Sequence, residues 1–253
     1  MKYYFDRPQT LIKVMSHFPI NKEKLFIFSY ICQNNLIPKE LSYFILNILY
    51  NSQKPKILIS RELLPDNKIS RFWVVENFVP NYPDIKIISG LLLKEPQIVV
   101  YGKVCHQNRN IGFFSNQSKG YKYSNQTIKS QPLDKYEPFK NLLSQVNDYL
   151  GTKFNGILVN EYIDGTKYLG AHSDSELGLD KSTKSVAGIS FGATRKFRIR
   201  DRITKKIVLD YEHAQRTLIV MDGNFQKEYT HEIVVQKKIK ECRISLTFRH
   251  HTE

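Results

Sequence analysis

The sequence predicts an α+β fold in which a strand-rich region follows a partly helical N-terminal extension. From about residue 91 onward, short apolar segments are separated by turn residues, which is typical of a β-sandwich or barrel. One amphipathic helix interrupts this series, and the sequence contains no internal repeat or low-complexity segment. We therefore expect an extension of unknown role over residues 1–90 and a strand-rich domain over residues 91–253.

The extension contains one segment with helical periodicity. Its apolar residues recur at the 3.6-residue spacing of an amphipathic helix, at Leu41, Phe44, Ile45 and Ile48. This spacing predicts a helix within residues 36–49. Further along, residues 72–75 and 85–88 fit either strands or a short helix.

The strand-rich region begins with a short strand and then a helix. The helix is predicted over residues 138–150, because its apolar residues share one face and Gly151 favours a helix end. Short apolar segments bounded by turn residues predict the strands. These strands span residues 98–101, 156–162, 185–191, 196–200, 206–209, 217–221, 227–231 and 243–248.

Composition limits the class of protein. The 253 residues include 38 Lys and Arg against 24 Asp and Glu, a net charge of +14, which favours nucleic acid or an anionic membrane surface as partner. No apolar run approaches the ~20 residues of a membrane span, and the N-terminus lacks a secretory signal. Three widely spaced cysteines, Cys32, Cys105 and Cys242, favour free thiols in a reducing compartment. We expect an intracellular monomer, nuclear if the source is eukaryotic.

Basic residues gather in two places. Residues 96–133 contain no Asp or Glu, and their Lys and Arg residues are interleaved with aromatic residues, a composition that binds phosphates and stacks bases. A solvated loop with aromatics in the core is the alternative. Near residue 200, Lys196, Arg198 and Arg200 alternate along one strand, which predicts a heavily charged face.

A candidate metal site follows from His172-Ser173-Asp174 and His231. On an extended segment, residues i and i+2 project to the same side, so His172 and Asp174 can bind one metal ion. Together with His231, they make the two-His, one-carboxylate set of non-haem Fe(II) oxygenases, which leaves positions open for cosubstrate and oxygen. Zinc is the competing metal, although the partners of a hydrolytic zinc site are not evident. A chance pairing of surface residues is the plain alternative.

The segment Arg243–Arg249 alternates strictly. Arg243, Ser245, Thr247 and Arg249 share one face, and the apolar residues between them share the other. We expect the apolar face to pack inside the sandwich. If the opposite face is also enclosed, its arginines need an anion, and a guanidinium suits a carboxylate. A half-exposed strand with a wet basic face is the alternative. Asn160 and Tyr162 form another i, i+2 pair, which can orient a small polar ligand.

Together these elements resemble the AlkB-type Fe(II)/2-oxoglutarate dioxygenases that repair alkylated nucleic acids. The motifs occur in the family's order: Asn160-x-Tyr162, His172-x-Asp174, His231 and Arg243-x5-Arg249. The segments 190–195 and 245–249 look like the family as well. The resemblance covers about residues 91–250 and points to the eukaryotic members that act on double-stranded DNA. It implies a double-stranded β-helix, or jelly-roll, core with flanking helices.

The resemblance implies a role for each matched residue. His172, Asp174 and His231 would bind Fe(II) and form the catalytic centre. Arg243 would pair with the distal carboxylate of 2-oxoglutarate, and O2 would be the second cosubstrate. The 2-oxoglutarate site would consist of Asn160, Tyr162, Arg243, Ser245, Thr247 and Arg249.

The resemblance also implies a substrate site. Tyr101, on a hairpin with Arg109 that enters the duplex, would fill the gap left by a flipped base. Tyr121 and Tyr123 would flank that base, and Glu176 would lie near its edge. The sequence departs from the family where Asn108 replaces the usual Pro and where residues 114–116 replace Tyr-Gly-Asp, and Tyr101 replaces a usual Phe. These departures concern the substrate and leave the reaction unchanged.

The implied reaction is oxidative demethylation of N1-methyladenine and N3-methylcytosine in DNA, releasing formaldehyde, succinate and CO2. A methylated base pairs poorly, so flipping it out of the helix costs less. The alternatives are the same chemistry on RNA or single strands, oxidation of protein side chains, and a non-catalytic nucleic-acid-binding module. The Tyr101 hairpin favours duplex DNA, the basic aromatic segment disfavours a protein substrate, and the complete metal and anion residues disfavour a non-catalytic module. No membrane partner is implied.

Overall fold

The computed structural model describes residues 55–63, 68–79, 83–100, 102–123, 126–174 and 185–251. A compact unit spans Pro55–Glu253. It begins well before residue 91, because residues 56–75 form two strands of the main sheet. The helix predicted within residues 36–49 lies outside the described residues.

The larger of the two main sheets has nine strands. It is antiparallel except where β5 pairs with β7 in parallel. Several of its strands are buried on both faces, which explains their nearly continuous apolar sequences. The strand order is β1 (Lys56–Leu63), β2 (Lys68–Val75), β13 (Leu218–Gly223), β10 (Val186–Gly192), β15 (Arg243–Arg249), β8 (Gly156–Tyr162), β5 (Asn110–Ser115), β7 (Gln126–Gln131) and β6 (Gly120–Tyr123).

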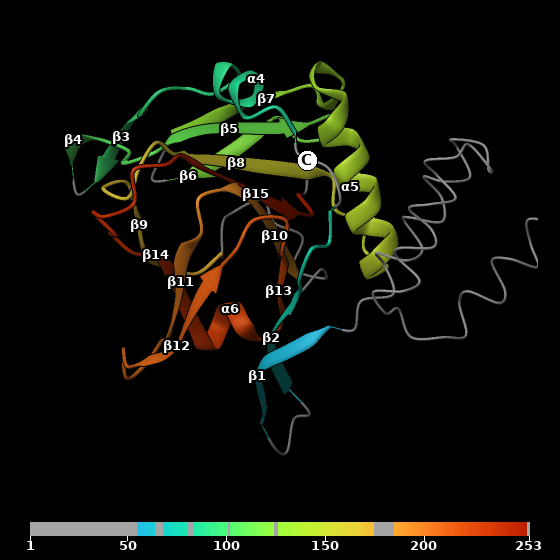
Figure 1. The fold of residues 1–253 in the computed structure, drawn as a ribbon, viewed down its shortest axis with the longest axis vertical. Helices are drawn as coiled ribbons and strands as arrows, with labels where there is room; N and C mark the ends of the chain where they lie inside the picture. The colour runs from blue at the N-terminus through green and yellow to red at the C-terminus, as the bar shows by residue number, and fades with distance from the viewer. Residues whose placement is uncertain are drawn as a thin grey trace, which may run out of the picture. The chain divides into compact units, whose positions relative to one another are not determined.

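The smaller sheet has four strands and packs against part of the larger one, as Figure 1 shows. Their shared core joins Phe72 and Ile219 of the large sheet to Phe197 and Ile233 of the small sheet. The rings of Phe72 and Phe197 are stacked with centroids 5.6 Å apart. This two-sheet arrangement confirms the predicted jelly-roll core. The small sheet is ordered β12 (Ile207–His213), β11 (Arg195–Asp201), β14 (Tyr229–Ile233) and β9 (Leu169–His172).

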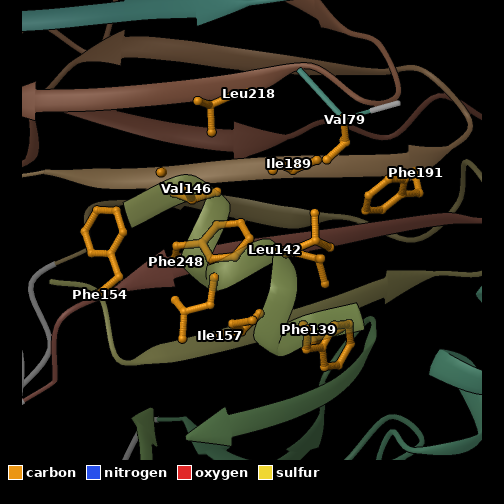
Figure 2. Packing of buried hydrophobic residues seen from close by; sticks show 14 of the residues in the cluster. Val79, Phe139, Leu142, Val146, Phe154, Ile157, Ile189, Phe191, Leu218 and Phe248 are labelled. Carbon is orange, nitrogen blue, oxygen red and sulfur yellow. The ribbon is translucent and has the colours of Figure 1, made fainter. Parts of the chain in front are cut away.

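A second core lies between the outer face of the large sheet and helix α5 (Glu137–Leu150). Figure 2 shows Phe139, Leu142 and Val146 of this helix beside Phe248 of β15. The expectation that the apolar face of β15 packs inside the sandwich was therefore wrong. Because the helix covers the sheet from outside, the apolar face of β15 points to the helix and its polar face points to the other sheet.

A separate hairpin consists of β3 (Gln97–Val100) and β4 (Lys103–His106). Val100 pairs with Lys103, and Gly102 just before Lys103 adopts a positive φ of 76°, which favours glycine. All four side chains of β4 are exposed. Tyr101, the residue expected to enter the base stack, lies outside the described residues.

Most predicted elements have their counterparts in the structure. Helix α5 ends at Gly151, which adopts a left-handed conformation with φ 64°. Residues 85–88 belong to helix α4 (Ile85–Gly90), whose first turn is capped by Asp84. The strand predicted over 227–231 was wrong in its first half, because a helical turn, α6 (Phe225–Glu228), precedes β14. A 3₁₀ turn, η1 (Leu133–Lys135), precedes α5. None of the helices in the described ranges is long and apolar enough to cross a membrane.

The charged face predicted on β11 carries both signs of charge. Arg198 Nε donates to Asp210 Oδ1 of β12 at 2.6 Å, and Arg200 Nε donates to Glu232 Oε1 of β14 at 2.7 Å. Lys196 Nζ lies 3.1 Å from the same aspartate. The neighbouring strands thus supply carboxylates that largely balance this face, so it adds little to a polyanion-binding surface.

Candidate metal centre and anion pocket

The three candidate metal ligands lie together at the inner face of the small sheet. His172 ends β9 and pairs directly with His231 of β14, so the two imidazoles share one face. Asp174 follows two residues after His172. Its carboxylate oxygens lie 3.6 Å from His172 Nε2 and 3.7 Å from His231 Nε2. One potential ligand atom from each residue lies within 4.8 Å of the other two, which one metal ion can bridge.

The protonation pattern of this cluster suits a metal ion. His172 Nδ1 lies 2.9 Å from the carbonyl oxygen of Gly170, which can only accept, so this nitrogen carries the proton and Nε2 is left as a ligand. Burial, followed by the repulsion that a protonated His172 would exert, lowers the pKa of His231 to about 3, so its imidazole is neutral at pH 7. Neutral imidazoles are the form that binds metals.

Asp174 is fixed in place from two sides. Its backbone N–H donates to Gln226 Oε1 at 2.8 Å, and Arg249 Nη2 donates to its Oδ1 at 2.7 Å. Burial alone would raise the pKa of Asp174, but the charge of Arg249 and the contacts with His231 and His172 together outweigh burial and hold this pKa well below its usual range. The other oxygen, Oδ2, is buried and has no hydrogen-bond partner among the described residues. A buried carboxylate oxygen beside two imidazole nitrogens fits Fe(II).

A pocket connects this cluster to the polar face of β15. Its empty volume is about 590 Å³, part of it open to solvent. In the large sheet, Asn160 lies opposite Ser245 and Tyr162 lies opposite Arg243, so both strands present polar groups to the same side. All the residues expected at the 2-oxoglutarate site line this pocket: Asn160, Tyr162, Arg243, Ser245, Thr247 and Arg249.

Arg243 is the most deeply buried of the three arginines that line the pocket. It is 1% exposed, and its Nη2 lies 3.1 Å from His213 Nδ1. Burial lowers the pKa of Arg243 to about 10, which still leaves the guanidinium charged at pH 7. Its Nε and Nη1 atoms are buried without a hydrogen-bond partner in the described part of the chain. A buried cation with donor atoms left unpaired fits an anionic ligand such as a carboxylate.

The residues expected to contact substrate are only partly brought together. Arg109, which the resemblance placed with the hairpin, follows β4 and is buried in the pocket wall, where its Nε donates to Asn160 Oδ1 at 2.6 Å. Tyr121 also lines the pocket, with Arg249 5.6 Å from its ring centroid. Tyr123 belongs to β6, but its side chain, like all of Glu176, lies outside the described residues.

Arg195 joins the loops that flank the two histidine-bearing strands. It is fully buried and donates to the carbonyl oxygens of Asp164 and Lys167, before β9, and of Val234, after β14. Gln236 accepts a further bond from its Nε. The other partners of Arg195 are main-chain atoms from distant segments, which no local pattern reveals.

Two polar residues at the site escaped the sequence analysis. Gln226, which fixes Asp174, lies in the helical turn α6, of which the sequence analysis had assigned the last two residues to a strand. His213, which contacts Arg243, ends β12 and is fully buried. A single histidine outside any motif gives no signal of its own, and only the packing of the two sheets brings it to Arg243.

The fold and this site define a class of enzyme. A family model described as the 2OG-Fe(II) oxygenase superfamily matches residues 74–249, and the chain belongs to this family. The expected cofactors, Fe(II), 2-oxoglutarate and O2, and the expectation of a dioxygenase are confirmed by this membership.

Named relatives narrow the class to the AlkB type, which confirms the resemblance. The chain is 33% identical over 138 residues to "Alpha-ketoglutarate-dependent dioxygenase alkB homolog 3" of Rattus norvegicus, covering 51% of this chain and 46% of that protein. It is 26% identical over 173 residues to "DNA oxidative demethylase ALKBH2" of Homo sapiens, covering 66% and 64%. The protein of the same name in Arabidopsis thaliana is 26% identical, covering 61% and 56%. The chain thus spans about half to two thirds of the length of these relatives.

Proposed function

We propose that this protein removes methyl groups oxidatively from N-alkylated bases in DNA, with N1-methyladenine and N3-methylcytosine as substrates. One observation carries the proposal. The cluster of His172, Asp174 and His231 opens into a pocket of about 590 Å³ that is lined by buried arginines. Relatives named as a DNA oxidative demethylase support the choice of substrate.

In this proposal His172, Asp174 and His231 hold Fe(II), which activates O2 with 2-oxoglutarate for oxidation of the methyl group. Arg243 offers its charge and a donor atom without a partner in the described residues, Nε or Nη1, to the distal carboxylate of 2-oxoglutarate. Arg109 donates to Asn160 Oδ1, which engages the amide oxygen and leaves the amide nitrogen of Asn160 to donate to the ligand. Arg249 holds Asp174 in its ligand orientation.

The nucleic acid contacts are proposed from exposure and charge. Lys103 on the β3–β4 hairpin and Lys119, Lys122 and Lys129 around β6 and β7 are all exposed, and no carboxylate occurs in residues 96–133. The base of the hairpin is anchored near β9, because Lys167 forms an ion pair with Glu95. Exposed lysines near the pocket support phosphate binding.

The test uses matched oligonucleotides carrying N1-methyladenine or N3-methylcytosine as duplex DNA, single-stranded DNA and RNA. With Fe(II), 2-oxoglutarate and O2, we expect loss of the methylated nucleoside by mass analysis, fastest in duplex DNA. His231→Ala is the inactive control. The absence of demethylation on every polymer would overturn the proposal. Faster turnover on RNA than on DNA would show that the substrate is RNA.

A second variant addresses the duplex preference. If Tyr101 fills the gap left by the flipped base, Tyr101→Ala should lower the rate on subsaturating duplex DNA roughly tenfold or more, because lost stacking costs about 1–3 kcal/mol per base. The rate on single strands should change little. Equal losses on both polymers, with a lower melting temperature, would make Tyr101 a structural residue.

A further inference from the structure

His213 holds the buried guanidinium of Arg243 from the opposite sheet. It ends β12 of the small sheet, pairs with Arg195 of β11, and is fully buried. Its Nε2 lies 3.0 Å from the carbonyl oxygen of Thr217, and its Nδ1 lies 3.1 Å from Arg243 Nη2. A carbonyl oxygen only accepts, so Nε2 carries the proton and Nδ1 accepts from Arg243. One tautomer therefore satisfies both ring nitrogens.

This partner is chemically unusual for a buried arginine. Buried guanidinium groups are commonly paired with a carboxylate, which would cancel the charge that an anionic ligand needs. A neutral imidazole orients the guanidinium and leaves its charge available. Burial, with a further contribution from Arg243, lowers the pKa of His213 to about 3, so the ring is neutral at pH 7.

The contact also limits how Arg243 can turn. With Nη2 held by His213, the Nε and Nη1 atoms are the donors that remain without a partner in the described part of the chain. The imidazole is itself held at Thr217, just before β13, so the guanidinium is fixed by a ring that cannot rotate freely. A side chain held this way binds without the entropy cost of ordering it.

We propose that His213 is a positioning residue for the cosubstrate, which sets the orientation of Arg243 while leaving its charge unpaired. This inference rests on the proposed function, in which Arg243 binds the distal carboxylate of 2-oxoglutarate. His213 does not contact the cosubstrate in this scheme and acts only through Arg243.

The test compares two substitutions of similar bulk. His213→Leu removes the acceptor, whereas His213→Asn keeps an oxygen near the place of Nδ1. Binding of 2-oxoglutarate is measured by calorimetric titration of the full chain loaded with Mn(II), a redox-inactive substitute for Fe(II), and KM and kcat are measured with Fe(II). We expect His213→Leu to raise Kd and KM for 2-oxoglutarate about tenfold, the worth of about one ordered hydrogen bond. kcat at saturating 2-oxoglutarate should change less than twofold.

Rescue and control variants separate positioning from packing. His213→Asn should recover most of the affinity. His251→Leu makes the same change at a buried histidine that does not line the pocket, and it should lower the melting temperature without changing Kd. If His213→Leu does not fold at the assay temperature, His213→Met takes its place. The inference would be overturned if His213→Leu left the Kd for 2-oxoglutarate unchanged. It would also be overturned if His213→Asn bound 2-oxoglutarate as weakly as His213→Leu does.

Arg243→Met tells the two proposals apart. If Arg243→Met binds 2-oxoglutarate normally, the proposed cosubstrate site itself is wrong. If Arg243→Met loses affinity and His213→Leu does not, only the role of His213 is wrong. Adding His213→Leu to Arg243→Met should cause no further loss, because the histidine acts through the arginine.

Discussion

The bond between Asp174 and Arg249 ties the metal cluster to the large sheet, so replacing Asp174 should have two separate effects. Asp174→Ala removes one of three candidate ligands, so the protein should no longer retain Fe(II). It also leaves Arg249, 3% exposed, without the carboxylate that accepts from its Nη2 at 2.7 Å. The metal-free protein should therefore lose stability as well.

The size of the second effect follows from the burial of the pair. Removing one partner of a buried ion pair typically costs about 3–5 kcal/mol, because the other charge stays in a dry environment. For a unit of this size, each kcal/mol lowers the melting temperature by roughly 2–4 °C. We expect a fall of roughly 10 °C in the metal-free Asp174→Ala protein, with the fold retained. Asp174→Ala/Arg249→Met removes both charges of this pair, so most of the stability should return while metal binding stays absent.

The assay combines metal analysis with thermal unfolding in the presence and absence of Mn(II). Wild type should melt higher with Mn(II), and both Asp174 variants should melt at the same temperature with and without it. Retention of stoichiometric metal by Asp174→Ala would refute the ligand assignment. An unchanged melting temperature in the metal-free single variant would refute the argument that Arg249 depends on this carboxylate.

Further expected outcomes concern the rest of the site. His231→Ala should reduce bound iron and succinate release to background, as metal analysis and a succinate assay can show. Arg243→Met should weaken 2-oxoglutarate binding about tenfold to a hundredfold, since a charge-assisted hydrogen bond is worth about 1.5–3 kcal/mol. The pKa of His213 is lowered to about 3 in the folded protein, against 6.5 in the unfolded chain. Between pH 6.5 and pH 3, therefore, His213 is protonated in the unfolded chain but not in the folded protein. Metal-free protein should thus lose up to about 1.4 kcal/mol of stability per pH unit from this group as the pH falls below 6.5, and urea unfolding of His213→Asn should show a shallower loss. Gly165→Ala should lower the melting temperature clearly, because its Cβ would collide with the carbonyl of Gln236.

Much of the fold could be predicted from local patterns. The strand Gly156–Tyr162 and the helix ending at Gly151 follow from apolar segments and a residue that favours a left-handed conformation. The strict alternation of residues 243–249 correctly indicated two different faces. It did not reveal which face points inward, because α5 covers the sheet from outside and that placement depends on contacts far apart in sequence.

The site was predicted as far as its residues form spaced motifs. His172, Asp174 and His231 lie on neighbouring strands, and the polar face of β15 meets them across one pocket. Arg109 and His213 could not be located in this way. The place of Arg109 is set by its bond to Asn160, and the place of His213 by its bond to Arg243, and both contacts join segments that are separate in sequence.

The hydrogen bonds of Arg195 determine which parts of the sequence near the metal ligands can vary. Apart from Gln236, its hydrogen-bond acceptors among the described residues are main-chain carbonyl oxygens, which every amino acid supplies. Apart from Gly165 and Gln236, the side chains of residues 163–168 and of the loop after β14 can therefore be exchanged without removing the hydrogen bonds by which Arg195 holds these segments together. The sequences of these loops can therefore change, and with them the substrate preference, while the guanidinium of Arg195 keeps the strands that carry the metal ligands at a constant spacing.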